Sequence, residues 1–268
     1  MIGEDPLDLG GQVALVTGAG QSVGREIALT LARHNVGGVA VNDYVLERAA
    51  AVAAEIEALG VKAVPVSFDV GDIAAVRAGF ATAKEKLGRA VTLLVNNAGN
   101  AGPNAQIGRS PEFWETDPAE WDRYFHTNTF GVMNCCHTAV PGMIEAGQGR
   151  IVTIVSDAGR VGEPRLAAYS AAKAAASGFV RAVAKETGRY GITSNAIALS
   201  AILPQMDPAK EQEFEQSEAG KRQVSRYVIR RFGRPADVAG MALYLCSDAA
   251  AFITGQTVPV DGGYAFAV

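Results

Sequence analysis

Residues 13–24 are Val-Ala-Leu-Val-Thr-Gly-Ala-Gly-Gln-Ser-Val-Gly. The apolar run Val13–Val16 is typical of a buried strand, and helical apolar spacing begins at Arg25. A glycine-rich turn between a strand and a helix is the context in which such turns bind phosphate. Glycines let backbone N–H groups approach a pyrophosphate, and the helix N-terminus adds a favourable dipole. The turn alone is weak evidence, because many helices begin after glycine.

The next predicted strand tests the phosphate-binding interpretation. Val39-Ala-Val41 leads to Asp43, nineteen positions after Gly24. A carboxylate at this distance can bind the ribose 2′-hydroxyl of an adenosine, and it would repel a 2′-phosphate. The sequence therefore favours NAD over NADP as the bound dinucleotide. The alternative is that Asp43 is a solvated side chain in an ordinary strand-to-helix turn.

Strands and helices continue to alternate along the first half of the chain. Apolar spacing predicts helices over about 46–59 and 73–87, and strands over 64–68 and 92–95. Strands that recur every 20–30 residues imply βαβ crossovers, and hence a parallel sheet with helices on both faces. Asn96-Asn-Ala-Gly99 follows the last of these strands, at the edge where open α/β sheets bind ligands, unless it is an ordinary turn.

The second half of the chain has the same alternation. A long helix is expected over about Ala119–Ile144, with Asn128 in its apolar interior. A buried amide must find partners, so Asn128 either opens a kink or relays a proton. No linker, repeat or low-complexity segment divides the chain, which predicts one domain. The remaining elements are strands over 151–155, 192–199 and 257–260, a loop over 159–165, and helices over about 167–189 and 235–246.

Residues 204–232 differ in character from the rest of the chain. Pro204 and Pro208 are followed by a charged run that is acidic first and basic afterwards. We expect a helical substrate lid inserted after the sixth strand. Charge runs are most often solvated surface, and the alternative is that the basic half, with Arg222 and Arg226, contacts an anionic part of a substrate.

Composition limits the classes of function. The 268 residues are 49% hydrophobic and 19% charged, which is typical of a compact globular protein. A net charge of −4 argues against nucleic acid or an anionic membrane as the main partner. The N-terminus lacks a signal pattern, no apolar run is long enough to span a membrane, and three cysteines cannot form a disulfide framework. We therefore expect a cytoplasmic protein, and the scattered histidines and cysteines predict no metal site.

A candidate acid/base pair follows the predicted strand over 151–155. Ser156 ends that strand, and Tyr169 and Lys173 are spaced i,i+4 in an alanine-rich helical segment, so both face the same way. An ammonium one turn from a phenol favours the phenolate and lowers the pKa of the tyrosine, and the serine hydroxyl can polarise a substrate oxygen. The alternative for this common spacing is a surface tyrosine packed on a lysine stem.

Together these motifs resemble the short-chain dehydrogenase/reductase family, from about Gly11 to Tyr264. Thr17, Gly18 and Gly24 match the glycine-rich turn of the family, with Ser22 in place of its second-last glycine. The resemblance implies a Rossmann-type, doubly wound parallel α/β sheet of about seven strands with helices on both faces, and a homotetramer. One departure is that Leu199-Ser200 and Pro204 stand where the family has Pro-Gly and a cofactor-contacting Thr. The catalytic tetrad of the family is matched in full by Asn128, Ser156, Tyr169 and Lys173.

The same resemblance implies a role for each site residue. Lys173 would hold the nicotinamide ribose and lower the pKa of Tyr169, which as phenolate would take the proton of a substrate alcohol. Ser156 would bind the substrate oxygen, and Asn128 would hold a water that connects Lys173 to solvent. The expected NAD-binding residues are Gly18, Gln21, Ser22, Val23, Gly24, Asp43, Asp69, Val70, Asn97, Ala98, Gly99, Tyr169, Lys173 and Ile202.

Three functions fit the sequence. The first is NAD(H)-dependent interconversion of a small secondary alcohol and a ketone, with hydroxyacyl-CoA thioesters and alicyclic or steroid-derived compounds as substrate analogies. The second is an NADPH-dependent 3-oxoacyl reductase, against which Asp43 argues. The third is a protein that senses dinucleotides without catalysis. Such proteins commonly lack the tyrosine or the lysine, and both are present here.

Overall fold

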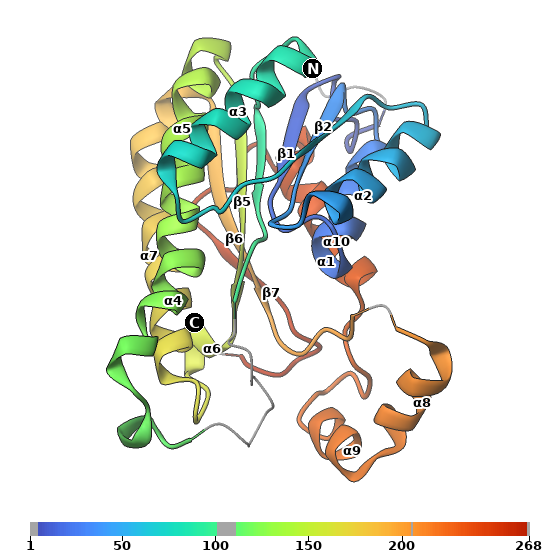
Figure 1. The fold of residues 1–268 in the computed structure, drawn as a ribbon, viewed down its shortest axis with the longest axis vertical. Helices are drawn as coiled ribbons and strands as arrows, with labels where there is room; N and C mark the ends of the chain where they lie inside the picture. The colour runs from blue at the N-terminus through green and yellow to red at the C-terminus, as the bar shows by residue number, and fades with distance from the viewer. Residues whose placement is uncertain (1–4, 101–110, 205, 267–268) are drawn as a thin grey trace.

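A seven-stranded sheet forms the centre of the molecule (Figure 1). The computed structural model describes residues 5–100, 111–204 and 206–266. All neighbouring strands are parallel, and their order is β3-β2-β1-β4-β5-β6-β7. Strands β1 to β3 therefore extend the sheet toward one edge, and β4 to β7 extend it from β1 toward the other edge, so the strand order reverses between β1 and β4. The strands are β1 Val13–Val16, β2 Gly38–Asn42, β3 Ala63–Val66, β4 Leu93–Asn96, β5 Gly149–Ser156, β6 Ile192–Leu199 and β7 Thr257–Val260.

Helices cover both faces of the sheet (Figure 1). In β1, Ala14 and Val16 join one apolar cluster with α1, α2 and α10, while Val13 and Leu15 join a second cluster with α3, α5 and α7. Alternate side chains of a strand point to opposite faces, so a strand buried on both faces is a continuous apolar run. The helices are α1 Ser22–Ala32, α2 Leu46–Ala58, α3 Ile73–Leu87, α5 Gly131–Ala146, α7 Ala167–Thr187 and α10 Pro235–Cys246.

The expected helix over 119–144 is interrupted in the structure. It consists of α4 (Asp122–Phe125), a π-helical turn (His126–Phe130) and then α5. A π-helical turn shifts the backbone register locally and often lies at a functional site. It contains Asn128, so the prediction of one continuous helix was wrong at the residue that sequence analysis had marked as a candidate kink.

Two further segments complete the description. The expected loop over 159–165 begins with a short helix, α6 (Ala158–Val161), so that part of the loop prediction was wrong. The charged segment forms α8 (Pro208–Gln216) and α9 (Glu218–Val224), which lie beyond the carboxyl edge of the sheet (Figure 1). Their action as a lid stays a prediction. Among the described residues, no helix combines the length and the apolar character needed to cross a membrane.

Candidate active site

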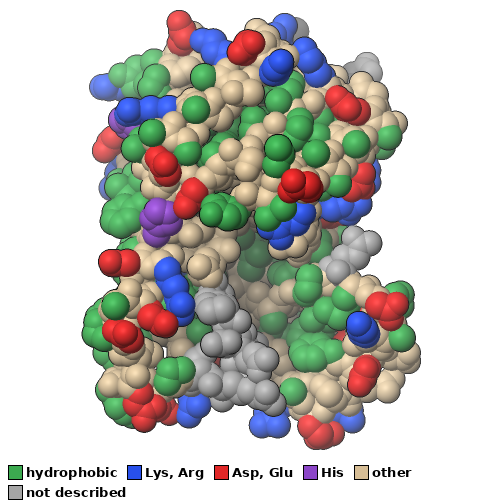
Figure 2. All heavy atoms as spheres, viewed as in Figure 1, with side chains coloured by type: hydrophobic (Ala, Val, Ile, Leu, Met, Phe, Trp, Pro, Cys, Tyr) green, Lys and Arg blue, Asp and Glu red, His purple; other side chains and the backbone are tan. Residues whose placement is uncertain are grey.

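A cavity of about 520 Å³ opens at the carboxyl ends of β1, β2 and β4. This is the point where the strand order reverses, the usual ligand site of an open α/β sheet. Figure 2 shows the surface hollowed in the middle of this face, beside the segment that contains α8 and α9. Eleven of the predicted cofactor-binding residues line the cavity: Gly18, Gln21, Ser22, Val23, Gly24, Asp43, Asp69, Val70, Asn97, Ala98 and Gly99.

Close backbone contacts form the floor of this cavity. A Cβ atom on Gly24 would lie 2.3 Å from the carbonyl oxygen of Gly18 and 2.4 Å from Nδ2 of Asn97, so only glycine fits there. Asn97 Nδ2 donates to the carbonyl oxygens of Thr17 and Gly18 at 2.9 and 3.0 Å. Ser22, which replaces a family glycine, adopts a φ of 49°, in the left-handed region that favours glycine. Ser22 therefore adopts the backbone conformation that a glycine at this position would favour.

The N-terminus of α1 lines this cavity with Ser22, Val23 and Gly24. The N-cap residue Gln21 makes no side-chain capping hydrogen bond, and the first turn holds no acidic residue. Free N–H groups and the positive end of the helix dipole suit a pyrophosphate. The residues present thus fit a dinucleotide.

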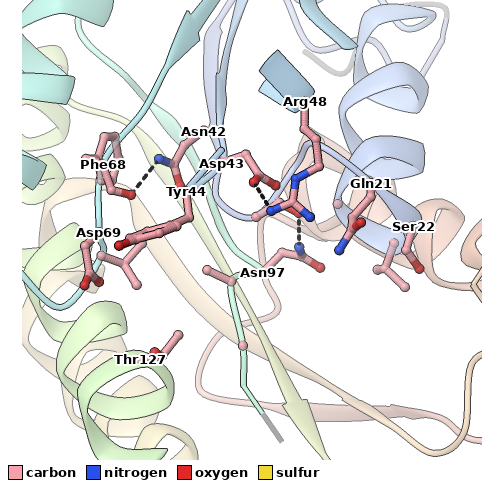
Figure 3. A pocket seen from close by; sticks show the side chains of 16 residues that line it. Gln21, Ser22, Asn42, Asp43, Tyr44, Arg48, Phe68, Asp69, Asn97 and Thr127 are labelled. Carbon is pink, nitrogen blue, oxygen red and sulfur yellow. Dashed lines mark hydrogen bonds and ion pairs between the residues drawn. The ribbon is translucent and has the colours of Figure 1, made fainter. Parts of the chain in front are cut away.

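Asp43, the predicted contact of the adenosine ribose, lines the cavity and is 4% exposed. Its Oδ2 accepts the N–H of Gly20 at 3.1 Å, and its Oδ1 accepts the N–H of Val45 at 3.0 Å. The Nη2 of Arg48 lies 2.8 Å from the same Oδ1 (Figure 3). Sequence analysis did not single out Arg48, although its place in the first turn of α2, five residues after Asp43, was a usable signal.

Asp69 and Tyr44 also line the cavity, and Tyr44 is 76% exposed (Figure 3). Asp69 Oδ1 accepts the N–H of Gly71 at 2.8 Å, and Oδ2 lies 3.0 Å from Nε2 of His126. Burial acts to raise the pKa of Asp69, but the Gly71 and His126 hydrogen bonds outweigh it, so the pKa is lowered. Neither Tyr44 nor His126 was identified from the sequence.

Two members of the predicted tetrad, Asn128 and Lys173, meet beside Gly99, which lines the cavity. A Cβ atom on Gly99 would lie 3.2 Å from both Oδ1 of Asn128 and Nζ of Lys173. Lys173 is buried in α7, donates to the carbonyl oxygen of Ile154 at 2.9 Å, and has its Nζ 5.9 Å from the ring centroid of Tyr169. The structure therefore brings the π-helical turn and α7 together beside Gly99, with Tyr169 next to Lys173.

Asn128 is fully buried and its amide is well satisfied. Nδ2 donates to the carbonyl oxygens of Tyr124 and Asn100, each at 2.8 Å, and Oδ1 accepts the N–H of Asn100 at 3.1 Å. These hydrogen bonds hold the backbone of Asn100 against the π-helical turn, so Asn128 has a structural role there. Its action as a water-holding relay stays a prediction.

Burial controls the titration of the two central groups. It raises the pKa of Tyr169, against a hydrogen bond with Ser156 that lowers it. Burial also lowers the pKa of Lys173 to about 8. The pKa of Tyr169 is thus raised in this structure, contrary to the expectation from spacing. The physical reason is that the phenol is desolvated while the Lys173 ammonium points to the Ile154 carbonyl.

The substrate side differs from the expectation in two places. Ile202, a predicted cofactor contact, is not in the dinucleotide cavity and lines a second cavity of about 400 Å³ with Tyr227. The unusual Ser200 has a partner, because its Oγ lies 2.9 Å from the hydroxyl of Tyr227. Arg226 is paired with Glu163 at 3.3 Å, so its charge is balanced within the protein.

Comparisons with known proteins agree with this geometry. Residues 18–265 match the family model described as enoyl-(acyl carrier protein) reductase. The chain is 37% identical over 252 residues to 3-oxoacyl-[acyl-carrier-protein] reductase FabG of Staphylococcus aureus, which covers 93% of this chain and 96% of that protein.

Two solved structures superpose along nearly the whole chain. A 7α-hydroxysteroid dehydrogenase complexed with NADH and 7-oxo glycochenodeoxycholic acid has a TM-score of 0.86 and 34% identity, with 98% of each chain covered. A gluconate 5-dehydrogenase of Burkholderia cenocepacia with NADP and tartrate has a TM-score of 0.85 and 30% identity, with 98% of this chain and 99% of that chain covered. The motifs, the parallel sheet and these full-length similarities show that the chain belongs to the short-chain dehydrogenase/reductase family.

Proposed function

We propose that this oxidoreductase interconverts a secondary alcohol and a ketone by hydride transfer with NAD(H). The observation that carries the proposal is the cluster of three side chains beside the dinucleotide cavity: Lys173 lies at the lining residue Gly99, Tyr169 lies next to Lys173, and Ser156 hydrogen-bonds Tyr169. A hydroxyl, a phenol and an ammonium beside such a cavity are what proton transfer beside a nicotinamide requires. A protein that only senses dinucleotides has no use for this group of side chains.

The side chains divide the proton chemistry between them. The bound nicotinamide supplies the hydride transfer, as acceptor in oxidation and donor in reduction. Ser156 donates a hydrogen bond to the substrate oxygen, and Tyr169 takes the proton of the alcohol or returns it to the oxygen of the ketone. Lys173, whose pKa burial lowers to about 8, supplies the positive charge that favours the Tyr169 phenolate once its ammonium turns from Ile154 to the ribose.

The choice of NAD(H) rests on Asp43. Its buried carboxylate favours a ribose 2′-hydroxyl and disfavours a 2′-phosphate. The second candidate is an NADPH-dependent 3-oxoacyl reductase, which the 37% identity to a protein of that name supports. The solved relatives include one complex with NADH and one with NADP, so the family alone does not decide between the two cofactors.

We propose an alcohol or ketone with a largely apolar reacting part as substrate, such as an alicyclic or steroid-derived compound or the acyl part of a CoA thioester. Three aromatic residues, Phe113, Trp121 and Tyr124, line a small cavity with Tyr169, and they support an apolar substrate surface beside the polar lining of Thr116, Glu120 and Arg165. The balanced charge of Arg226 weakens the case for an anionic group at that position. We also propose a cytoplasmic homotetramer. Two exposed apolar side chains, Phe130 in the π-helical turn and Met133 in α5, support subunit contacts on this helix.

The experiment that tests this function is turnover with NAD⁺ and with NADP⁺ across a panel of secondary alcohols. The panel contains free hydroxy acids, alicyclic and steroid alcohols, and hydroxyacyl groups as free acids and as CoA thioesters. We expect NAD⁺-linked oxidation of at least one apolar class. Absence of any nicotinamide-linked turnover in either direction, with a folded protein that binds dinucleotide, would support the sensing protein instead.

A further inference from the structure

The loop that follows β6 begins beside the proposed reaction centre. Leu199, the last residue of β6, pairs with Ser156 in the register of the sheet. The carbonyl oxygen of Leu199 accepts the N–H of Asp157 at 3.0 Å. Residues 200–203 therefore leave the sheet next to the serine that is proposed to bind the substrate oxygen, and the path of this loop shapes the site there.

The hydroxyl of Tyr227 joins this loop to the charged segment. Tyr227 follows α9 and is 3% exposed, so its hydroxyl must find partners within the protein. Gln223 Nε2, from α9, donates to it at 2.7 Å, and the backbone N–H of Ala201 donates to it at 3.2 Å. The Oγ of Ser200 lies 2.9 Å away. One oxygen atom thus links α9 to two consecutive residues of the loop.

The direction of each hydrogen bond follows from the groups present. A hydroxyl has one hydrogen to donate and two lone pairs that accept. Gln223 and Ala201 fill both acceptor positions of the Tyr227 oxygen, so its hydrogen is donated to the remaining partner, the Oγ of Ser200. Ser200 stands where the family has a glycine, which has no side-chain acceptor. The serine that departs from the family pattern therefore completes the hydrogen bonding of Tyr227.

Backbone contacts hold the far end of the same loop. Leu203 N–H donates to the carbonyl oxygen of Gly233 at 3.0 Å, and Gly233 N–H donates to the carbonyl oxygen of Ala201 at 3.3 Å. A Cβ atom on Gly233 would lie 2.3 Å from Cδ1 of Ile202, so the two chain segments are in close contact. The segment after α9 therefore holds the loop at both ends, by a side chain at one and by backbone at the other.

We propose that Tyr227 is a positioning residue for the nicotinamide end of the site, acting through Ser200 and the backbone of Ala201. The inference rests on the proposed function and extends it to a residue outside the dinucleotide cavity. With the Tyr227 hydroxyl in place, the loop beside Ser156 keeps the conformation that receives the nicotinamide. Without it, two buried donors lose their acceptor, and the loop populates that conformation less often.

Calorimetric titration of Tyr227→Phe with NADH and with ADP-ribose tests this proposal without any turnover. ADP-ribose lacks the nicotinamide, so its dissociation constant should stay within about twofold of that of the unmodified protein. The dissociation constant for NADH should rise about tenfold, as expected when a lost hydrogen bond leaves a buried donor unpaired. A merely structural role would weaken both ligands alike, so the ratio of the two constants separates positioning from general loss of stability.

Ser200→Ala tests the same contact from the loop. It removes the acceptor of the Tyr227 hydrogen and keeps the bonds from Gln223 and Ala201, so the dissociation constant for NADH should rise by only about threefold. Combined with Tyr227→Phe, it should add little to the effect of Tyr227→Phe alone, because both substitutions remove one shared contact.

Tyr264→Phe is the matched control. It removes a tyrosine hydroxyl that donates to Glu163 at 2.7 Å, and its ring centroid lies 5.8 Å from that of Tyr227. Both dissociation constants should stay within about twofold in this variant, because the lost hydrogen bond does not reach the loop after β6.

The outcomes separate this proposal from the function on which it rests. An unchanged ratio of the two dissociation constants in Tyr227→Phe and in Ser200→Ala would overturn the role of Tyr227 and leave the dehydrogenase proposal intact. Fully additive effects in the double variant would also contradict it. If Tyr227→Phe does not fold, Ser200→Ala decides alone, because it keeps the tyrosine. Failure of the unmodified protein to bind either ligand would overturn the dinucleotide site, and the role of Tyr227 with it.

Discussion

The proposed active site has two halves that are held by different kinds of contact: a dinucleotide half, the cavity around Gly24 and Asn97, and a substrate half, the region of Glu112, Glu163, Arg165 and Arg226. The dinucleotide half consists of buried backbone: Gly24 packs against Gly18, and Asn97 Nδ2 bonds two carbonyl oxygens. The substrate half is held by partly exposed side chains, such as Glu163 with Arg226 and Arg165 with Glu112 at 2.8 Å. The dinucleotide half therefore accepts few substitutions, whereas the substrate half can change its side chains with little effect on the fold.

The reason for this difference is energetic. A clash with buried backbone cannot relax, so it typically costs about 1–3 kcal/mol or more. An exposed ion pair contributes only about 0–1 kcal/mol, because water and salt screen it. A fold with these two halves can keep one cofactor while it varies its substrate. The predictions below test the contrast, starting with the largest effect.

Gly24→Ala should damage the dinucleotide half most severely. The added Cβ would meet backbone and side-chain atoms at 2.3 and 2.4 Å, so we expect a loss of about 3 kcal/mol in unfolding free energy. Dinucleotide binding should be lost as well, because the turn must shift. Urea unfolding and calorimetric titration measure the two effects.

The matched control is Gly240→Ala, in an exposed turn of α10 where a Cβ meets no atom within 4 Å. It should stabilise the protein by about 0.5–1 kcal/mol, through helix propensity alone. Equal effects of the two substitutions would mean that the close backbone contacts do not distinguish the dinucleotide half.

Lys173→Met tests the boundary between the halves. Burial lowers the pKa of Lys173 from 10.5 to about 8, so between these values the unfolded chain binds more protons than the native protein. Stability must then rise with pH in this window, by about 2 kcal/mol between about pH 7.5 and about pH 9.5. The methionine variant lacks this contribution. Urea unfolding of both nucleotide-free proteins across this range measures it, and a constant stability difference between them would contradict the buried-ammonium account.

Glu163→Gln should have the smallest effect, in the substrate half. Glu163 accepts from the Tyr264 hydroxyl at 2.7 Å and pairs with Arg226 at 3.3 Å, linking the segment after α9 to the C-terminal part of the chain. We expect less than about 1 kcal/mol in stability and a change in KM of about fivefold or less.

A spectroscopic measurement accompanies that substitution. Burial, together with the hydrogen bond to Glu163, raises the pKa of Tyr264 to about 12. The tyrosine titration should therefore move to lower pH in Glu163→Gln. As a control, Glu218→Gln removes an exposed pair with Lys221 at 3.5 Å and should change neither stability nor titration. A loss of several kcal/mol in Glu163→Gln would show that the substrate half is as tightly built as the dinucleotide half.

Most of the fold could be predicted from the sequence because its signals are local. Val13–Val16 is apolar at every position, since both faces of a central parallel strand are buried, and Ile73–Leu87 has helical spacing. The π-helical turn at His126–Phe130 could not be predicted, because its extra residue depends on packing against other elements. α6 was missed for a related reason, since four residues carry too little periodicity to indicate a helix.

The candidate site shows the same limit. Gly24 and Asp43 were identified because their spacing from neighbouring elements is characteristic. Arg48 and His126 were missed, because their importance comes from Asp43 and Asp69, which they meet only in the folded chain. The raised pKa of Tyr169 was missed because spacing shows its neighbour Lys173 but not its burial. Contacts between distant segments and desolvation are properties of the folded structure.

The most direct test of the central claim is the turnover of Tyr169→Phe with the alcohol that the panel identifies. The substitution removes one hydroxyl and keeps the ring beside Tyr124. If Tyr169 transfers the proton, turnover should fall by about 10²–10⁴-fold. The dissociation constant for NADH, measured by fluorescence, should stay within about threefold, because nearly all of the dinucleotide cavity is formed by other residues. Turnover within about tenfold of the unmodified protein would contradict the assignment of Tyr169 as the acid/base.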